Sequence, residues 1–134
     1  MPKTWGQKLD DGRTAEVKPL TRAYAGAPEG AAMLVSTPRE VESYMRRVPV
    51  GQTRTIRQMR DDLARAHGAE VTCPMSTSIF ARIAAEAALE AAAVGLPVEE
   101  VTPFWRVIGP ETPLAGKLSC GAAFVAERRA AERN

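Results

Sequence analysis

The chain has 134 residues, of which 45% are hydrophobic and 25% are charged, and this composition is typical of one globular domain with its own core. The formal net charge of +2 is too small to indicate a polyanionic partner by itself. The sequence has no apolar run of about 18 residues and no secretion-signal pattern at its start. We therefore expect a cytoplasmic protein without a membrane partner.

Two cysteines, Cys73 and Cys120, and one histidine, His67, lack the spacing of a metal site. We expect both thiols to be reduced, and we expect neither a metal ion nor another cofactor.

Residues 1–36 resemble an N-terminal arm, because prolines and glycines interrupt every periodic pattern in this segment. Only Trp5 and the run at residues 31–35 are apolar enough to dock on a core. We expect the arm to be loosely ordered and the folded domain to comprise residues 37–134.

Two helices are predicted at the start of this domain. Thr37 and Pro38 suit the cap and first position of a helix that ends before Pro49, and Glu40 could complete a capping box. A second capping box, Thr55 to Gln58, begins a helix that ends near Gly68.

A long alanine-rich helix is predicted from Met75 or Ser76 to Val94, because alanine has the highest helix propensity. The final helix should run from Ala122 to about Glu132. Between them we expect a short β element near residues 105–119. The fold class is therefore mainly α.

Six arginines lie within one third of the chain, an uneven distribution that matters more than the net charge. Two helices joined by a turn, with arginines on the first, fit a helix-turn-helix or a plain helical hairpin. The arginines are Arg46, Arg47, Arg54, Arg57, Arg60 and Arg65.

The stretch T-P-F-W-R-V-I-G, residues 102–109, concentrates aromatic groups in a chain that has few. Phe104 and Trp105 could fill the core, or they could form the wall of a pocket for a flat ligand. Arg106 could bind a phosphate or carboxylate, or it could point into water.

Several motifs, in order, resemble the DNA-binding domain of the O6-alkylguanine-DNA alkyltransferases over about residues 37–132. The resemblance implies a winged-helix-like domain that binds DNA. The matching residues are Val48-Pro49-Val50-Gly51, Thr55, Leu63-Ala64, Gly68, Pro97, Pro103-Phe104-Trp105-Arg106-Val107-Ile108 and Gly121.

The chain departs from this family at its reactive residues. Phe104 stands where the family has its alkyl-accepting cysteine, and Trp105 stands where it has the activating histidine. Neither ring can act as a nucleophile or general base, so we do not expect alkyl transfer by the family mechanism. Ile56 replaces the family tyrosine. Glu132 falls on the glutamate that binds the histidine, and we expect it to be solvated.

The chain is then similar to alkyltransferase-like proteins, which lack the cysteine, bind O6-alkylguanine in DNA and pass the lesion to excision-repair proteins. Arg82 is the best match to the family's intercalating arginine, although an ungapped alignment would place Ala87 there. Phe104, Trp105 and Arg106 would form the base pocket. Glu86 and Glu90 would repel phosphate if they faced DNA. The residues expected to contact DNA are Arg54, Thr55, Arg57, Ser76, Thr77, Ser78 and Arg82.

Two other functions remain open from the sequence. Cys73 precedes a predicted helix start, where the helix dipole lowers a thiol pKa, so it could be the nucleophile of an enzyme that uses the same pocket for a small molecule. His67 could then act as its base. The chain could instead be a protein-interaction module that uses the alanine-rich helix and the arm bearing Trp5.

Overall fold

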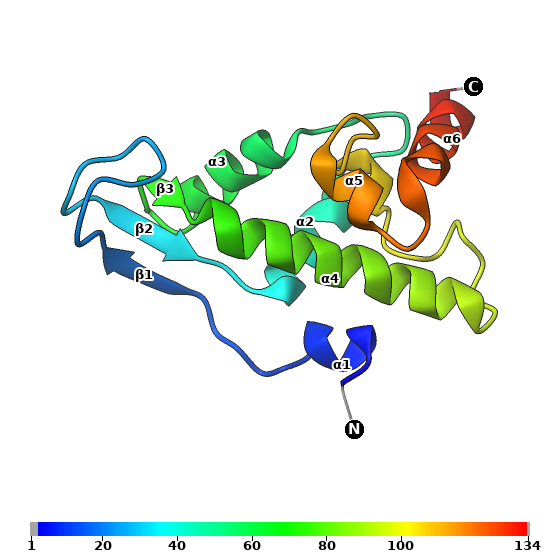
Figure 1. Cartoon of the computed structure of the whole chain (residues 1–134), viewed down its shortest axis with the longest axis horizontal. Coiled ribbons are helices and arrows are strands. Elements are labelled where there is room, and N and C mark those ends of the chain that lie inside the picture. Colours follow the sequence, from blue (N-terminus) through cyan, green and yellow to red (C-terminus); the bar gives the residue numbers. More distant parts are fainter. Residues whose placement is uncertain (1–2, 134) are drawn as a thin grey trace.

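The computed structural model describes residues 3–133 and shows a mainly helical protein with one small sheet, which confirms the predicted fold class at this level (Figure 1). The elements, in chain order, are α1 (Trp5–Leu9), β1 (Glu16–Pro19), β2 (Ala32–Val35), α2 (Pro38–Arg47), α3 (Ile56–Ala66), β3 (Val71–Thr72), α4 (Pro74–Ala93), the 3-10 helix η1 (Phe104–Arg106), α5 (Pro113–Lys117) and α6 (Gly121–Arg133).

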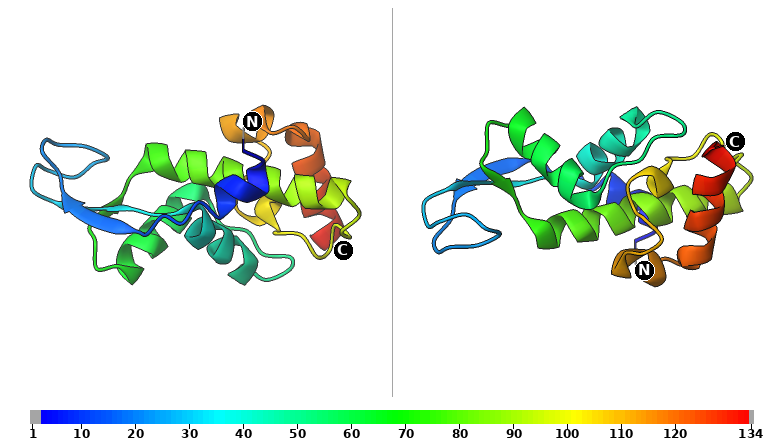
Figure 2. Two further views of the ribbon diagram at one scale, coloured as in Figure 1. Left: turned by 90° about the horizontal axis from the view of Figure 1, so that it is seen from below. Right: turned by 90° about the horizontal axis from the view of Figure 1, so that it is seen from above.

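The long helix α4 is the central element, and α1, α2 and η1 pack directly against it (Figure 2). It begins with Pro74 at the first helical position and ends at Val94, after which Gly95 adopts a positive φ of 112°. Nine of its side chains are buried, most of them alanines that allow neighbouring elements to approach closely. Phe80 of this helix joins Met45, Leu63 and Trp105 in the main core cluster.

Both helices predicted from capping residues are present. The hydroxyl of Thr37 accepts a hydrogen bond from the Glu40 N–H, and Thr55 forms a complete capping box with Gln58. The Glu40 side chain does not complete the first box, because its carboxylate bonds to Ser36 and His67 instead.

The sheet has the order β1-β2-β3. Strand β2 pairs antiparallel with β1 and parallel with β3. Leu34 of β2 is fully buried in the main core and lies opposite Thr72 of β3. Strand β3 directly precedes α4, so the sheet lies beside the first turn of the long helix (Figure 1).

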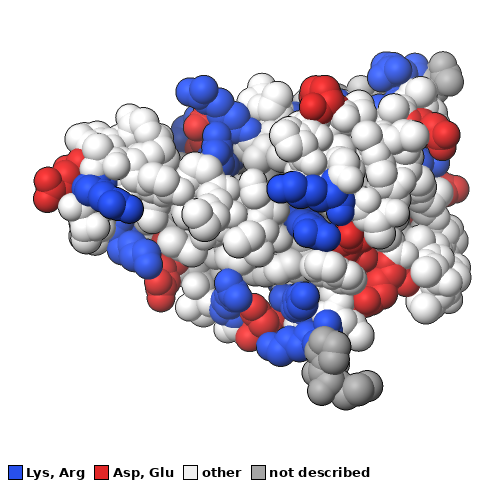
Figure 3. All heavy atoms as spheres, in the orientation of Figure 1, with Lys and Arg blue, Asp and Glu red and all other residues white. Residues whose placement is uncertain are grey.

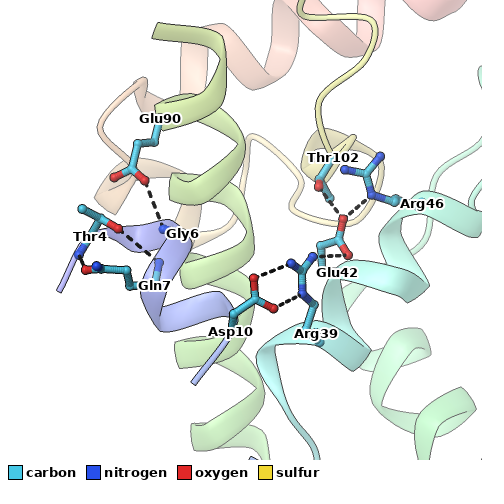
Figure 4. A network of polar contacts seen from close by, with 9 residues as sticks. All are labelled: Thr4, Gly6, Gln7, Asp10, Arg39, Glu42, Arg46, Glu90 and Thr102. Carbon is cyan, nitrogen blue, oxygen red and sulfur yellow. Dashed lines mark hydrogen bonds and ion pairs between the residues drawn. The ribbon is translucent and has the colours of Figure 1, made fainter. Parts of the chain in front are cut away.

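The expectation of a loosely ordered arm is wrong for the described part of residues 1–36. Helix α1 packs on α4, where the Glu90 carboxylate accepts hydrogen bonds from the backbone N–H groups of Trp5 and Gly6. Figure 4 shows the bond to Gly6. The Asp10 carboxylate binds the Arg39 guanidinium at 2.6 Å through two nitrogens. These partners lie far along the sequence, so the local pattern of glycines and prolines does not show them.

The short β element expected near residues 105–119 is also absent. Residues 104–106 form η1, and the Thr112 hydroxyl caps the short helix α5. The β-branched Val107 and Ile108 are buried in the core without pairing in a strand. Their burial needs only apolar neighbours, which helices supply here as well as a sheet would.

Among residues 3–133, every helix is too short or too polar to span a lipid bilayer.

Candidate nucleic-acid interface

The arginines of α3 lie beside the start of α4. Arg57 is exposed and Arg60 is half-buried, and within residues 3–133 neither side chain forms an ion pair. They share a cleft of about 490 Å³ with Pro74, the first residue of α4. The remaining lining residues come from the β1–β2 loop, α3 and β3: Ala25, Gly26, Asp61, Val71 and Thr72. A cleft with two free guanidinium groups suits a phosphate backbone.

The first two turns of α4 present an exposed face. Ser78 lies on this face, and Ser76 is partly exposed. Met75 and Ile79 are also exposed, a feature that the sequence analysis missed. The sequence carried one sign of this: Met75 and Ile79 are four positions apart, which puts them on one helix face, and neither belongs to the buried alanine face.

Thr77 lies on the opposite side of α4 from these residues. Its side chain is fully buried, and its hydroxyl donates to the Cys73 carbonyl at 2.7 Å. It therefore has no surface to offer to a ligand, in contrast to Ser76 and Ser78.

Arg82 lies one turn further along α4, between Trp5 of α1 and Glu86 of α4. Its guanidinium lies 5.6 Å from the centre of the Trp5 ring, and its Nε lies 4.0 Å from the Glu86 carboxylate. The Arg82 side chain is still 43% exposed. It is therefore stacked on α1 and partly available to solvent.

Thr55 and Arg54 lie just before α3. The Thr55 hydroxyl is used as the helix cap, and the Arg54 guanidinium bonds to Gln52 and to the Thr53 carbonyl. The Arg54 N–H donates to the Arg106 carbonyl at 2.7 Å, which ties this loop to η1.

Several carboxylates of α3 and α4 are bound to protein groups, but Asp61, which lines the cleft with Arg57 and Arg60, has no ion-pair partner within residues 3–133. Glu86 accepts two hydrogen bonds from Ser119, and Glu90 accepts the two from α1. Asp62 pairs with Arg65 and accepts a hydrogen bond from the Tyr44 hydroxyl. Burial raises the pKa of the Tyr44 phenol, and the hydrogen bond to Asp62 raises it further. On the face that bears α4, cationic side chains form separate groups with some carboxylates between them (Figure 3).

The structure places Phe104 and Trp105 in the core. Phe104 is fully buried, with its ring 5.2 Å from Trp105 in an edge-on arrangement and 6.1 Å from Phe124 in a stacked one. Trp105 is 1% exposed and borders a separate cleft of about 470 Å³ with Arg128 and other residues. A base could stack on either ring only after this aromatic cluster had opened.

Arg106 pairs with Glu132 in fork geometry. Its Nε donates to Oε1 at 2.9 Å, its Nη2 to Oε2 at 2.8 Å, and its Nη1 to the Val48 carbonyl at 2.8 Å. These hydrogen bonds lower the pKa of Glu132 against the opposing effect of burial, and the nearby indole of Trp105 adds to the lowering. The expectation of a solvated Glu132 is therefore wrong.

The two candidates for an enzyme site lie apart. Cys73 caps α4, and its sulfur accepts a hydrogen bond from the Ser76 hydroxyl at 3.3 Å. Burial works to raise the pKa of this thiol, but hydrogen bonds from Ser76, Met75 and Tyr24 lower it overall. His67 is bonded to Glu40 at 2.6 Å, so the structure does not pair it with Cys73.

No metal centre is evident in the described part of the chain, where no three His, Cys, Asp or Glu side chains are grouped to hold an ion. Comparisons of the chain with protein-family models, with curated proteins and with solved structures found no match to any of them.

Proposed function

We propose that the chain is a non-catalytic DNA-binding protein that recognises alkylated or flipped guanine without transferring the alkyl group. In this proposal α3 and α4 act as a helix-turn-helix within a winged-helix-like domain. The observation that carries it is the position of Arg57 and Arg60, which have no ion-pair partner within residues 3–133 and share a cleft with the first turn of α4.

The rest of the candidate surface supports the same function. Ser78 and Arg82 lie on the first three turns of α4, where hydroxyl and guanidinium groups would contact phosphates. Hydrogen bonds from Ser119 and from the α1 backbone orient the carboxylates of Glu86 and Glu90 toward protein groups, although these neutral donors do not offset their repulsion of phosphate. Phosphate contacts of this kind provide affinity and orientation but no sequence specificity.

The absence of alkyl transfer follows from the chemistry of residue 104. Phe104 has no lone pair to attack an alkyl carbon, and its ring is packed against Phe124. A lesion would therefore be bound and left unchanged, for a repair protein to process.

Two measurements test this function. Retardation of a fluorescent duplex, plain or containing O6-methylguanine, should be strong at low salt and should weaken steeply as salt rises. Mass spectrometry after incubation with an alkylguanine oligonucleotide should show no added alkyl group on the protein. Absence of retardation with both duplexes at low salt would refute DNA binding, and a permanent mass gain would refute the non-catalytic assignment.

A second candidate function is an enzyme with Cys73 as nucleophile, and the lowered pKa of this thiol is the observation that favours it. If the wild type turns over a small-molecule substrate, loss of that activity in Cys73→Ser but not in Cys120→Ser would support an enzyme with Cys73 as nucleophile. Equal activity of both variants would exclude Cys73 from the chemistry.

A further inference from the structure

Two large apolar side chains stand exposed on the first two turns of α4. Met75 is 68% exposed and Ile79 is 53% exposed. They are four residues apart on a regular helix, so they lie one above the other on the same face. Single exposed apolar residues are ordinary, and this adjacent pair forms a small apolar patch on one helix face that is available to a partner.

Cationic groups lie beyond both ends of this apolar pair. Ser78 and Arg82 follow on the same side of α4. On the flank toward α3, Arg57 and Arg60 share their cleft with Pro74, the residue directly before Met75. Positive charge around an apolar centre suits a polyanion that can also take up apolar groups, and duplex DNA is such a partner, because its stacked bases lie between phosphate chains.

We propose that Met75 and Ile79 form an apolar wedge that enters between neighbouring base pairs and kinks the duplex. This inference rests on the proposed DNA-binding function and assigns a second task to the same helix. Proteins that insert methionine or isoleucine between base steps offset the cost of unstacking by burying the inserted side chain and by contacting more of the bent DNA. Helix α4 contacts α1, α2 and η1, and these neighbours would hold it in place as it presents the wedge.

A second copy of this chain is the main alternative occupant of the apolar pair. A twofold symmetric contact through this face would bring together the two copies of the surface that bears Arg57, Arg60 and Arg82. This repulsion would oppose the gain from burying two side chains, so the charges favour DNA over self-association.

The test uses the whole chain and a short duplex with a fluorophore at each end and 2-aminopurine at a central TA step, which is an easily kinked step. The test variant is Met75→Ala with Ile79→Ala, because alanine keeps the helix. The control is Val94→Ala, which shortens an 85% exposed side chain at the far end of α4. Circular dichroism checks the fold of each variant.

We expect the wild type and the control to bring the duplex ends closer in energy transfer and to raise 2-aminopurine fluorescence. The double variant should do neither and should bind about tenfold more weakly, because two apolar side chains no longer leave water. The salt dependence of its binding should be unchanged, since no cation is removed.

Three results would overturn the proposal in distinguishable ways. Equal affinity and equal fluorescence signals for the double variant and the wild type would refute the wedge but not DNA binding. A wild-type dimer in light scattering that becomes monomeric in the double variant, with DNA binding unchanged, would assign the surface to a second copy. Absence of any duplex binding by the wild type would refute the proposed function, and the wedge with it.

Discussion

Arg106 and Glu132 hold each other in a pair that is almost closed to solvent, with side chains only 12% and 10% exposed. The pair fastens η1 to the last turn of α6, and the third bond of Arg106, to Val48, fastens both to the end of α2. The C-terminal helix is therefore held to the core by charge as well as by Val125 and Phe124.

Removal of one partner of this pair should destabilise the protein. We expect Arg106→Ala to lower the free energy of unfolding by about 2 kcal/mol, because it leaves a poorly solvated carboxylate without its donors. Urea unfolding at neutral pH measures this loss. Arg65→Ala is the matched control, since the side chains of its pair with Asp62 are 72% and 38% exposed. Equal midpoints for the two variants would show that the inner pair contributes nothing.

The same pair predicts a loss of stability in acid. The folded pKa of Glu132 lies below its ordinary value of 4.5. Between the two pKa values the unfolded chain binds more protons than the folded one, so the contribution of Glu132 is complete above pH 4.5 and disappears as pH falls through the folded pKa. Urea midpoints across this range should therefore fall more steeply for the wild type than for Glu132→Gln. Parallel curves would contradict the assignment.

Arg57 and Arg60 should supply salt-dependent affinity for DNA. If each contacts one phosphate, Arg57→Ala with Arg60→Ala should reduce the slope of log affinity against log salt by about 2 and weaken plain and alkylated duplex alike. The control is Arg65→Ala on the same helix, because Arg65 already pairs with Asp62. A slope that changes as much in the control as in the double variant would remove the special role of the cleft.

The two thiols should titrate separately. The pKa of Cys73 is lowered from 9.0 by the hydrogen bonds at the start of α4, whereas burial raises the pKa of Cys120. Thiolate absorbance at 240 nm should therefore rise in two steps, the first lost in Cys73→Ser and the second in Cys120→Ser. If Cys73→Ser removes the higher step, the order of the two groups is reversed.

The sequence alone determined the helices whose signals are local. Thr37 and Thr55 cap α2 and α3 as predicted, because the hydrogen bonds of a cap join residues only three positions apart. Alanine content likewise predicted α4, expected from Met75 or Ser76 to Val94 and found at Pro74–Ala93, and the last helix was found within a residue at each end. The sequence put Arg57 and Arg60 on one predicted helix, and only the structure shows that they share a cleft with Pro74 of α4.

The tertiary structure decided what depends on distant partners. Glu90 and Arg39 hold the N-terminal segment that appeared too irregular to fold, and Leu34 places β2 in the core. Phe104 and Trp105 were open to two interpretations until Phe124, from a helix further along the chain, completed their cluster. Burial and charge pairing depend on the neighbours that folding brings together. A sequence pattern reflects only the interactions between residues that are close along the chain.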